Sequence, residues 1–151
     1  MSALTGPLIA ECSTWLSIVS KLFNTRMGVL LAPHDLTPSQ FSILHHVTRQ
    51  RIVGGHSISQ IAAAVEVEQP AVTKTMAKFR NMGLVKIEPH PSDNRSKLVS
   101  ATPEADRLLG TIYQDMGPDL FKVFGSLNGT DIEAFAGNLK TLGQWLDKNR
   151  L

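Results

Sequence analysis

Two short helical segments, joined by residues 66–68, constrain this chain more than any other feature of its sequence. The first segment opens at Ser57 with a capping-box pattern, a serine followed three positions later by a glutamine, and runs to about residue 65. The second begins at Gln69 and ends at Gly83, a natural C-terminal cap. Helices this short with so tight a link predict a helix-turn-helix, whose second helix presents side chains to the major groove of DNA.

A β-hairpin is predicted directly after the second helix. Residues 84–88 and 96–101 are short β-prone runs, and the polar, turn-forming residues 89–94 separate them. A hairpin in this position forms the wing of a winged helix.

Longer amphipathic patterns flank this unit, at about residues 8–31, 37–50, 102–124 and 130–148. Pro33 closes the first pattern, and Thr37 opens the second with a capping box. A further capping box is expected from Thr130 to Glu133. The predicted fold class is therefore mainly α with a small β-hairpin wing, a winged helix-turn-helix with further helices at both ends.

The helix at residues 69–83 has two unlike faces. Its apolar side chains recur at helical spacing and are expected to point inward, whereas the outer face contains no acidic residue. Residues 69–99 contain six basic and two acidic residues, a net charge of +4 in a chain whose total is +2. Such a separation of charge is typical of a surface that meets phosphates.

The sequence resembles the MarR family of winged helix-turn-helix transcriptional regulators. The resemblance covers most of the chain, and its most specific part is the Asp-x-Arg-x-Lys pattern of the wing. The matching segments are Leu36-Thr37-Pro38-Ser39-Gln40, Thr73-Lys74, Gly83-Leu84-Val85, Asp93-Asn94-Arg95-Ser96-Lys97 and Thr102-Pro103-Glu104. The chain departs from the family pattern at Ile87 and Glu88, where basic residues are frequent, and at Ala101 and Ala105.

The resemblance implies roles for individual residues. Arg95 is expected to enter the minor groove from the wing tip, with Asp93 holding Arg95 or bracing the wing and Lys97 near the phosphate backbone. On the second helix of the motif, the residues expected in the major groove are Gln69, Thr73 and Lys74, and Lys78 is expected to face phosphate.

The resemblance also implies a homodimer that binds a near-palindromic operator, with repression as the commoner mode. We expect a single domain over residues 1–151, with a DNA-binding lobe at 37–101 and dimerisation helices at 8–31 and 103–148. The candidate dimer contacts are Leu8, Trp15, Leu120, Phe121, Phe124, Leu139, Leu142 and Trp145, each of which could equally belong to the core of one chain.

A small lipophilic or phenolic anion is the effector that the resemblance suggests, in a crevice lined by Trp15, Arg26, Phe41 and His45. A redox-responsive regulator using Cys12 is an alternative, since one branch of the family senses peroxide through a cysteine on the first helix. The other alternative is a winged-helix protein-interaction module without DNA specificity.

Other classes have little support in the sequence. It contains no phosphate-binding glycine loop and no recognisable catalytic triad, so no enzyme activity and no cofactor are expected. The neighbours His45 and His46 point to different helix faces, and no histidine follows His90, so no metal site is expected. The single Cys12 excludes an intrachain disulfide. With no signal-peptide pattern and no long apolar run, the expected location is the cytoplasm, without membrane contact.

Overall fold

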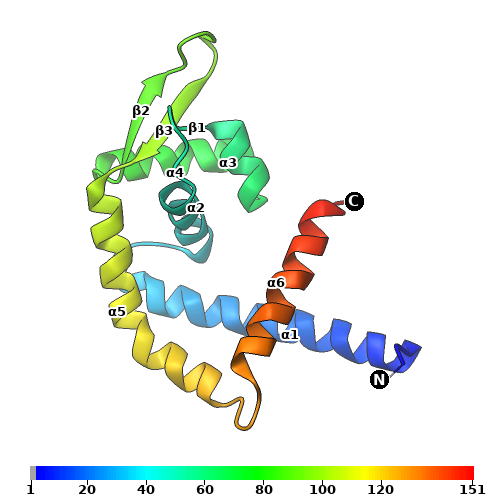
Figure 1. Ribbon diagram of the computed structural model, residues 1–151. Helices are drawn as coiled ribbons and strands as arrows, with labels where there is room; N and C mark the ends of the chain where they lie inside the picture. Colours follow the sequence, from blue (N-terminus) through cyan, green and yellow to red (C-terminus); the bar gives the residue numbers. More distant parts are fainter. Residues whose placement is uncertain (1–2) are drawn as a thin grey trace. The chain divides into compact units, whose positions relative to one another are not determined.

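The computed structural model describes residues 3–151, which fold mainly into α-helices (Figure 1). The described residues form two compact units, 3–112 and Tyr113–Leu151, and the long helix α5 runs from the first into the second. The elements of the first unit, up to the start of α5, are α1 (Gly6–Leu31), the 3₁₀ turn η1 (Ala32–His34), α2 (Pro38–Arg49), β1 (His56–Ser57), α3 (Ile58–Val65), α4 (Gln69–Asn81), β2 (Val85–Pro89) and β3 (Lys97–Ala101). The predicted order of helices and hairpin is thus confirmed.

The capping boxes at the starts of α2 and α3 form as their sequences predict. At α2, the Gln40 backbone N–H donates to Thr37 Oγ1 over 3.2 Å, and the Thr37 backbone N–H donates to Gln40 Oε1 over 3.1 Å. At α3, Ser57 and Gln60 repeat the exchange at 3.2 and 2.9 Å. These bonds satisfy backbone donors that a helix start otherwise leaves without partners.

The core of the first unit is apolar and draws on every helix of that unit. Leu31 from the end of α1 packs into it, and so does Ile112 from α5. The remaining fully buried large side chains within this unit come from α2, the helix-turn-helix, the link between α4 and β2, and the sheet: Ile43, Leu44, Val47, Ile61, Val72, Met76, Phe79, Leu84 and Val99. Burial of this surface is the main force that holds α3 and α4 together.

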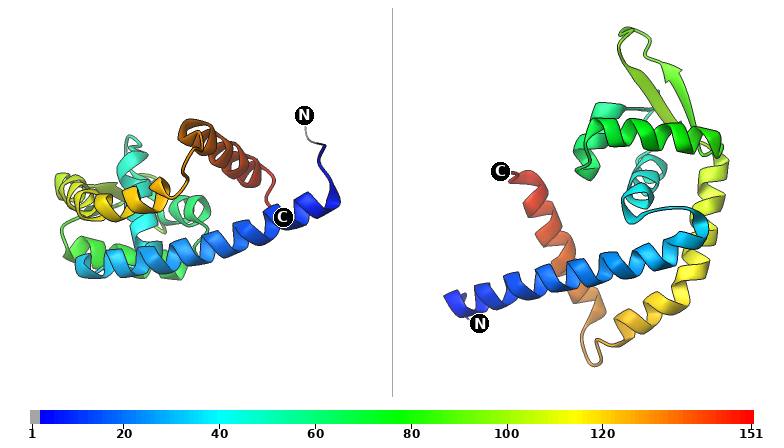
Figure 2. Two further views of the ribbon diagram at one scale, coloured as in Figure 1. Left: turned by 90° about the horizontal axis from the view of Figure 1, so that it is seen from below. Right: turned by 180° about the vertical axis from the view of Figure 1, so that it is seen from behind.

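The sheet has three strands, one more than the predicted hairpin. β1 pairs antiparallel with β3, with His56 opposite Val99, so the strand order is β1-β3-β2. The preceding Gly55 has a φ of +93°, and a Cβ at this position would lie 2.7 Å from the Val99 carbonyl oxygen. Only glycine lets β1 approach β3 so closely. The hairpin β2–β3 extends beyond the helices on the side of the lobe away from α1 (Figures 1 and 2).

The second unit contains the C-terminal part of α5 (Pro103–Gly125) and α6 (Ile132–Lys148). Pro118 lies inside α5, where it removes a backbone donor from the helix. The predicted capping box at Thr130 was wrong by one residue. Asp131 is the N-cap, because its carboxylate accepts the Ala134 backbone N–H at 3.0 Å, while the Thr130 N–H donates to the Leu127 carbonyl in the preceding turn.

Among residues 3–151, no helix combines the length and the apolar character that crossing a membrane requires.

Candidate nucleic-acid interface

α4 has the two faces that its sequence predicts. Val72, Met76 and Phe79 are fully buried and fix the helix against the lobe. Pro70 occupies the first turn, where its missing N–H costs nothing, and Gly83 ends the helix with a φ of +74°. The buried side chains hold the axis of α4, so its opposite face is presented on a rigid support.

The exposed face of α4 is polar and basic. Three of the residues predicted to bind DNA, Gln69, Thr73 and Lys74, are exposed on it. Arg80 is exposed as well, seven positions after Thr73 and therefore on the same side of the helix. The prediction did not include Arg80 in the site, although the charge pattern of residues 69–99 contains it.

Lys78 lies at the edge of this face and is held by the protein itself. Its ammonium group donates to the backbone carbonyl of Asp35 and, over 3.1 Å, to Gln40 Oε1. The Asp35 carboxylate is 3.4 Å away. The side chain of Lys78 is only 29% exposed, whereas that of Asp35 is 87% exposed. The predicted phosphate contact is thus engaged with an internal anion in the isolated chain.

A surface cavity of about 500 Å³ lies beside Lys78, between the N-terminal turn of α2 and α4. No carboxylate lines it, and both Lys74 and Lys78 do. The other lining residues are Thr37, Ser39, Gln40, Val67, Ala71, Thr75 and Asn81. The exposed face of α4 therefore continues as a positively charged groove toward the start of α2.

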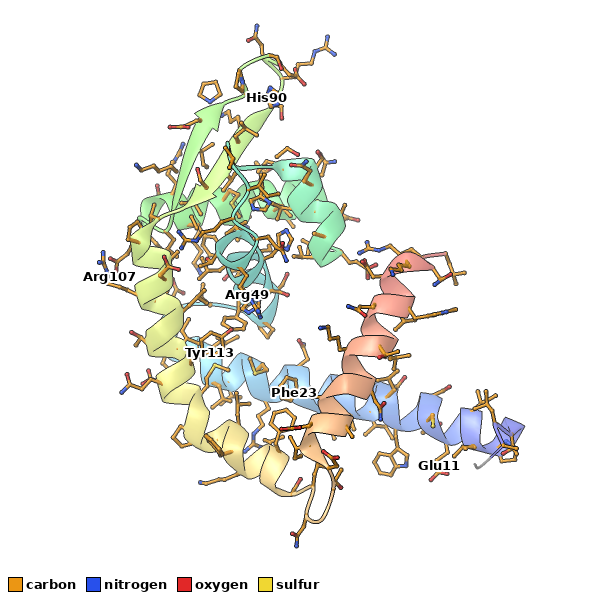
Figure 3. All side chains as sticks on the ribbon, in the orientation of Figure 1. Glu11, Phe23, Arg49, His90, Arg107 and Tyr113 are labelled. Carbon is orange, nitrogen blue, oxygen red and sulfur yellow. The ribbon has the colours of Figure 1, made fainter. Side chains whose placement is uncertain are left out.

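The wing tip is a structured turn. The Arg95 backbone N–H donates to Asp93 Oδ1 at 2.9 Å, and the Ser96 N–H donates to the Asp93 carbonyl at 3.1 Å. The His90 ring accepts the Ser92 N–H at its Nδ1 atom over 3.2 Å, near the end of the hairpin (Figure 3). Asp93 thus holds the backbone of Arg95 and leaves its side chain exposed at the tip.

The two strands of the wing add further cations. Lys97 begins β3 opposite Pro89, and Lys86 lies on β2 opposite Ser100; both lysines are exposed. Glu88, where the MarR pattern often has a basic residue, is exposed on β2 as well.

A histidine pair lies where α2 meets the sheet. The rings of His46 and His56 approach at 5.3 Å between centroids, and His56 is buried with its Nε2 against the Gln50 carbonyl. Burial lowers the pKa of His46, and the charges of His56 and His45 lower it further. Burial also lowers the pKa of His45, with a further contribution from Arg49.

The residues of the predicted effector crevice lie on α1 and α2. Phe41 and His45 lie one turn apart on α2 with ring centroids 6.1 Å apart. Trp15 and Arg26 are both exposed on α1 and stand three turns apart along it. The α2–α4 cavity beside Lys78 is lined by other residues.

Cys12 is a free, exposed thiol on α1. Within the part of the chain that the structure describes, no three His, Cys, Asp or Glu residues come together as a metal site requires.

Comparison with known proteins agrees with this geometry. Residues 36–105 match a family model described as a winged helix DNA-binding domain. A MarR-family transcriptional regulator from Rhodococcus sp. RHA1 superposes with a TM-score of 0.76 at 20% identity, over 97% of this chain and 100% of that one. CouR from Rhodococcus jostii RHA1, bound to p-coumaroyl-CoA, gives 0.74 at 20% identity over 97% and 99%. A MarR mutant from E. coli, complexed with operator DNA, gives 0.68 at 22% over 93% and 99%.

The matched residues, the exposed basic helix and the wing together form a winged helix DNA-binding domain. Over nearly the whole chain the fold is that of solved MarR regulators, so the fold that the resemblance implied is confirmed.

Proposed function

We propose that the protein is a transcriptional regulator, acting as a repressor, that binds a near-palindromic operator as a homodimer. One observation carries the proposal: α4 presents an exposed face with basic and no acidic side chains, and an arginine-tipped wing follows it on the same lobe. A major-groove helix with an adjacent minor-groove contact explains both parts together.

The proposed contacts follow from exposure and chemistry. Gln69, Thr73 and Lys74 read base edges in the major groove, and amide and ammonium groups suit adenine and guanine edges respectively. Arg95 enters the minor groove from the wing, while Lys97 and Lys78 meet phosphates. We add Arg80, at the C-terminal end of α4, as a contact to the phosphate backbone of DNA.

The outer helices support the homodimer. α6 has no buried residue, and Leu31 is the only buried residue of α1. Both helices expose large apolar side chains, including Trp15 (57% exposed) and Trp145 (60% exposed). An apolar surface of this kind favours a partner, and a second copy would place two recognition helices about 34–36 Å apart along one side of the duplex.

A small-molecule effector is the less constrained part of the proposal. CouR was solved with p-coumaroyl-CoA bound, which supports an aromatic acid derivative as the ligand class to test first. For this chain we retain Trp15, Arg26, Phe41 and His45 as the residues to examine, beginning with the Phe41–His45 pair on α2.

Selection of bound duplexes from a random pool tests the proposal directly. The expected product is a palindrome whose half-sites are about one helical turn apart, bound about 10³-fold or more tighter than random duplex. Selected duplexes without two-fold symmetry would contradict the proposed binding as a homodimer. A chain that retains no duplex above background would contradict DNA binding itself.

A further inference from the structure

We infer that Asp35 is an internal competitor of the DNA backbone for Lys78, so that duplex binding requires this lysine to change partners. The inference rests on the proposed function and adds a residue outside the helix-turn-helix to the DNA-binding site. It concerns one cation on α4 and one carboxylate at the turn between α1 and α2.

Two hydrogen bonds and an ion pair hold the ammonium group of Lys78. Such a group has three N–H donors and no acceptor. Here it faces the Asp35 carbonyl, the Asp35 carboxylate at 3.4 Å and Gln40 Oε1 at 3.1 Å. A phosphate oxygen that approaches Lys78 therefore competes with these three oxygens for its charge.

The oxygens that face Lys78 differ in the free energy that each would lose if the lysine moved away. Gln40 Oε1 also accepts the Thr37 backbone N–H, so it stays in the capping box of α2 without Lys78. The carboxylate of Asp35 is almost fully exposed, and water can solvate it when the lysine leaves. An ion pair of this exposure is weak, which makes exchange for a phosphate feasible.

The surroundings favour the exchange. Lys78 lines the carboxylate-free groove that it shares with Lys74, so the route from Asp35 to a phosphate along α4 is open to solvent. The exchange leaves a bare carboxylate beside the DNA, however. The favourable electrostatic energy between Lys78 and a phosphate is offset by the repulsion between that phosphate and Asp35.

This offset has a measurable signature in salt dependence. Each phosphate neutralised by a protein cation adds about 0.9 to the slope of log K against log salt concentration. With Asp35 present, the exchange should contribute close to nothing to that slope. With Asp35 neutralised, Lys78 should contribute its full share.

The test is a double-mutant cycle of Asp35→Asn and Lys78→Ala. Binding to a fluorescent random-sequence duplex is measured by anisotropy between about 50 and 200 mM KCl. Asp35→Asn should tighten binding by about two- to fivefold at the lowest salt and steepen the slope by about 0.9. Because the Lys78→Ala chain has no ion pair to break, Asp35→Asn should tighten binding about twofold more in the wild-type background than in the Lys78→Ala background.

Two further variants control for poor folding of Asp35→Asn and for the general effect of removing a carboxylate. Asp35 has a φ of +56°, which both asparagine and glycine adopt readily, so Asp35→Gly should reproduce the effect of Asp35→Asn if one of them folds poorly. Asp106→Asn is the matched control: it removes one carboxylate from another ion pair of the same unit, with Arg51. Its effect should be the same with and without Lys78.

The outcomes separate the inference from the proposed function. A wild-type chain that binds no duplex overturns both. If the wild type binds and Asp35→Asn changes the affinity equally with and without Lys78, the two residues act independently and the inference fails alone. If Lys78→Ala changes the slope in neither background, Lys78 has only a structural role, and the inference fails as well.

Discussion

The imidazole of His46 meets that of His56 edge to face, with ring centroids 5.3 Å apart, across the junction between α2 and β1. Because burial and the neighbouring charges lower the pKa of His46 below its ordinary value of 6.5, the folded state favours the neutral ring more than the unfolded state does. The contribution of this ring to stability is therefore complete above about pH 6.5 and is lost as the pH falls through the lower, folded-state pKa.

Thermal unfolding followed by circular dichroism should show this loss. The wild-type Tm is expected to be level above about pH 7.5 and to decrease below about pH 6.5. His46→Gln should make the decrease shallower, whereas His90→Gln, on the distant wing, should keep the wild-type profile. A variant of His46 with an unaltered profile would contradict the assignment.

Gly55→Ala should destabilise the protein more than Gly54→Ala. Both glycines have positive φ, +88° at Gly54 and +93° at Gly55, so alanine is strained at either position. Only at Gly55 would the new Cβ meet the Val99 carbonyl, whereas at Gly54 it meets nothing within 4 Å. We expect a loss of ~1 kcal/mol at Gly54 and a larger loss, by ~1–3 kcal/mol, at Gly55. Urea unfolding of the two variants measures the difference, and equal losses would argue against close packing of β1 on β3.

Gln69→Ala and Arg80→Ala should affect DNA binding in different ways. Loss of a base contact at Gln69 should relax preference at one position of the selected operator by ~1–3 kcal/mol. Loss of a phosphate contact at Arg80 should weaken all duplexes alike and lower the salt slope by ~1. Titrations of operator, point-substituted operator and random duplex distinguish them. Identical behaviour of the two variants would mean that the faces of α4 are wrongly assigned.

Asp93→Ala should reproduce part of the effect of Arg95→Ala, because the Asp93 carboxylate fixes the Arg95 backbone at the wing tip. Arg95→Ala is expected to weaken binding by ~1–3 kcal/mol, mainly on operators with A·T-rich flanks. Asp93→Asn keeps an acceptor at Oδ1 and should bind nearly as the wild type does. Flank-independent losses would rule out insertion into the minor groove.

Trp145→Glu should produce monomers at micromolar concentration if the exposed face of α6 is a dimer contact. A charge buried in an apolar interface carries a large desolvation cost, and a monomer reads only one half-site. Light scattering after size exclusion reports the mass, and Lys148→Glu, at the end of the same helix, controls for the added charge. If the Trp145→Glu variant remains dimeric, Trp145 is not part of the dimer interface.

The sequence predicts those parts of the fold that depend on local signals. The capping boxes at Thr37 and Ser57 lie within four residues of chain and form as predicted. β1 was missed because two residues are too short to show a strand period, and its pairing depends on β3, far along the chain. At the start of α6, two adjacent residues can cap a helix, and the pattern does not distinguish Asp131 from Thr130.

The candidate site likewise combines features that local sequence signals predict with one that depends on long-range packing. Exposure of Thr73 and Lys74 follows from the helical period of α4, which the sequence displays. The partner of Lys78 does not follow from it, because Asp35 is 43 positions away and reaches Lys78 only through the packing of the lobe.

The pairing of His56 with Val99 closes a long loop of the chain. The segment between these partners contains both helices of the helix-turn-helix. The contact between β1 and β3 is therefore non-local and carries a loop-closure cost that the local hairpin β2–β3 does not. A fragment that begins after β1 would lack both α2 and the third strand, so its hairpin would pack only against α3 and α4.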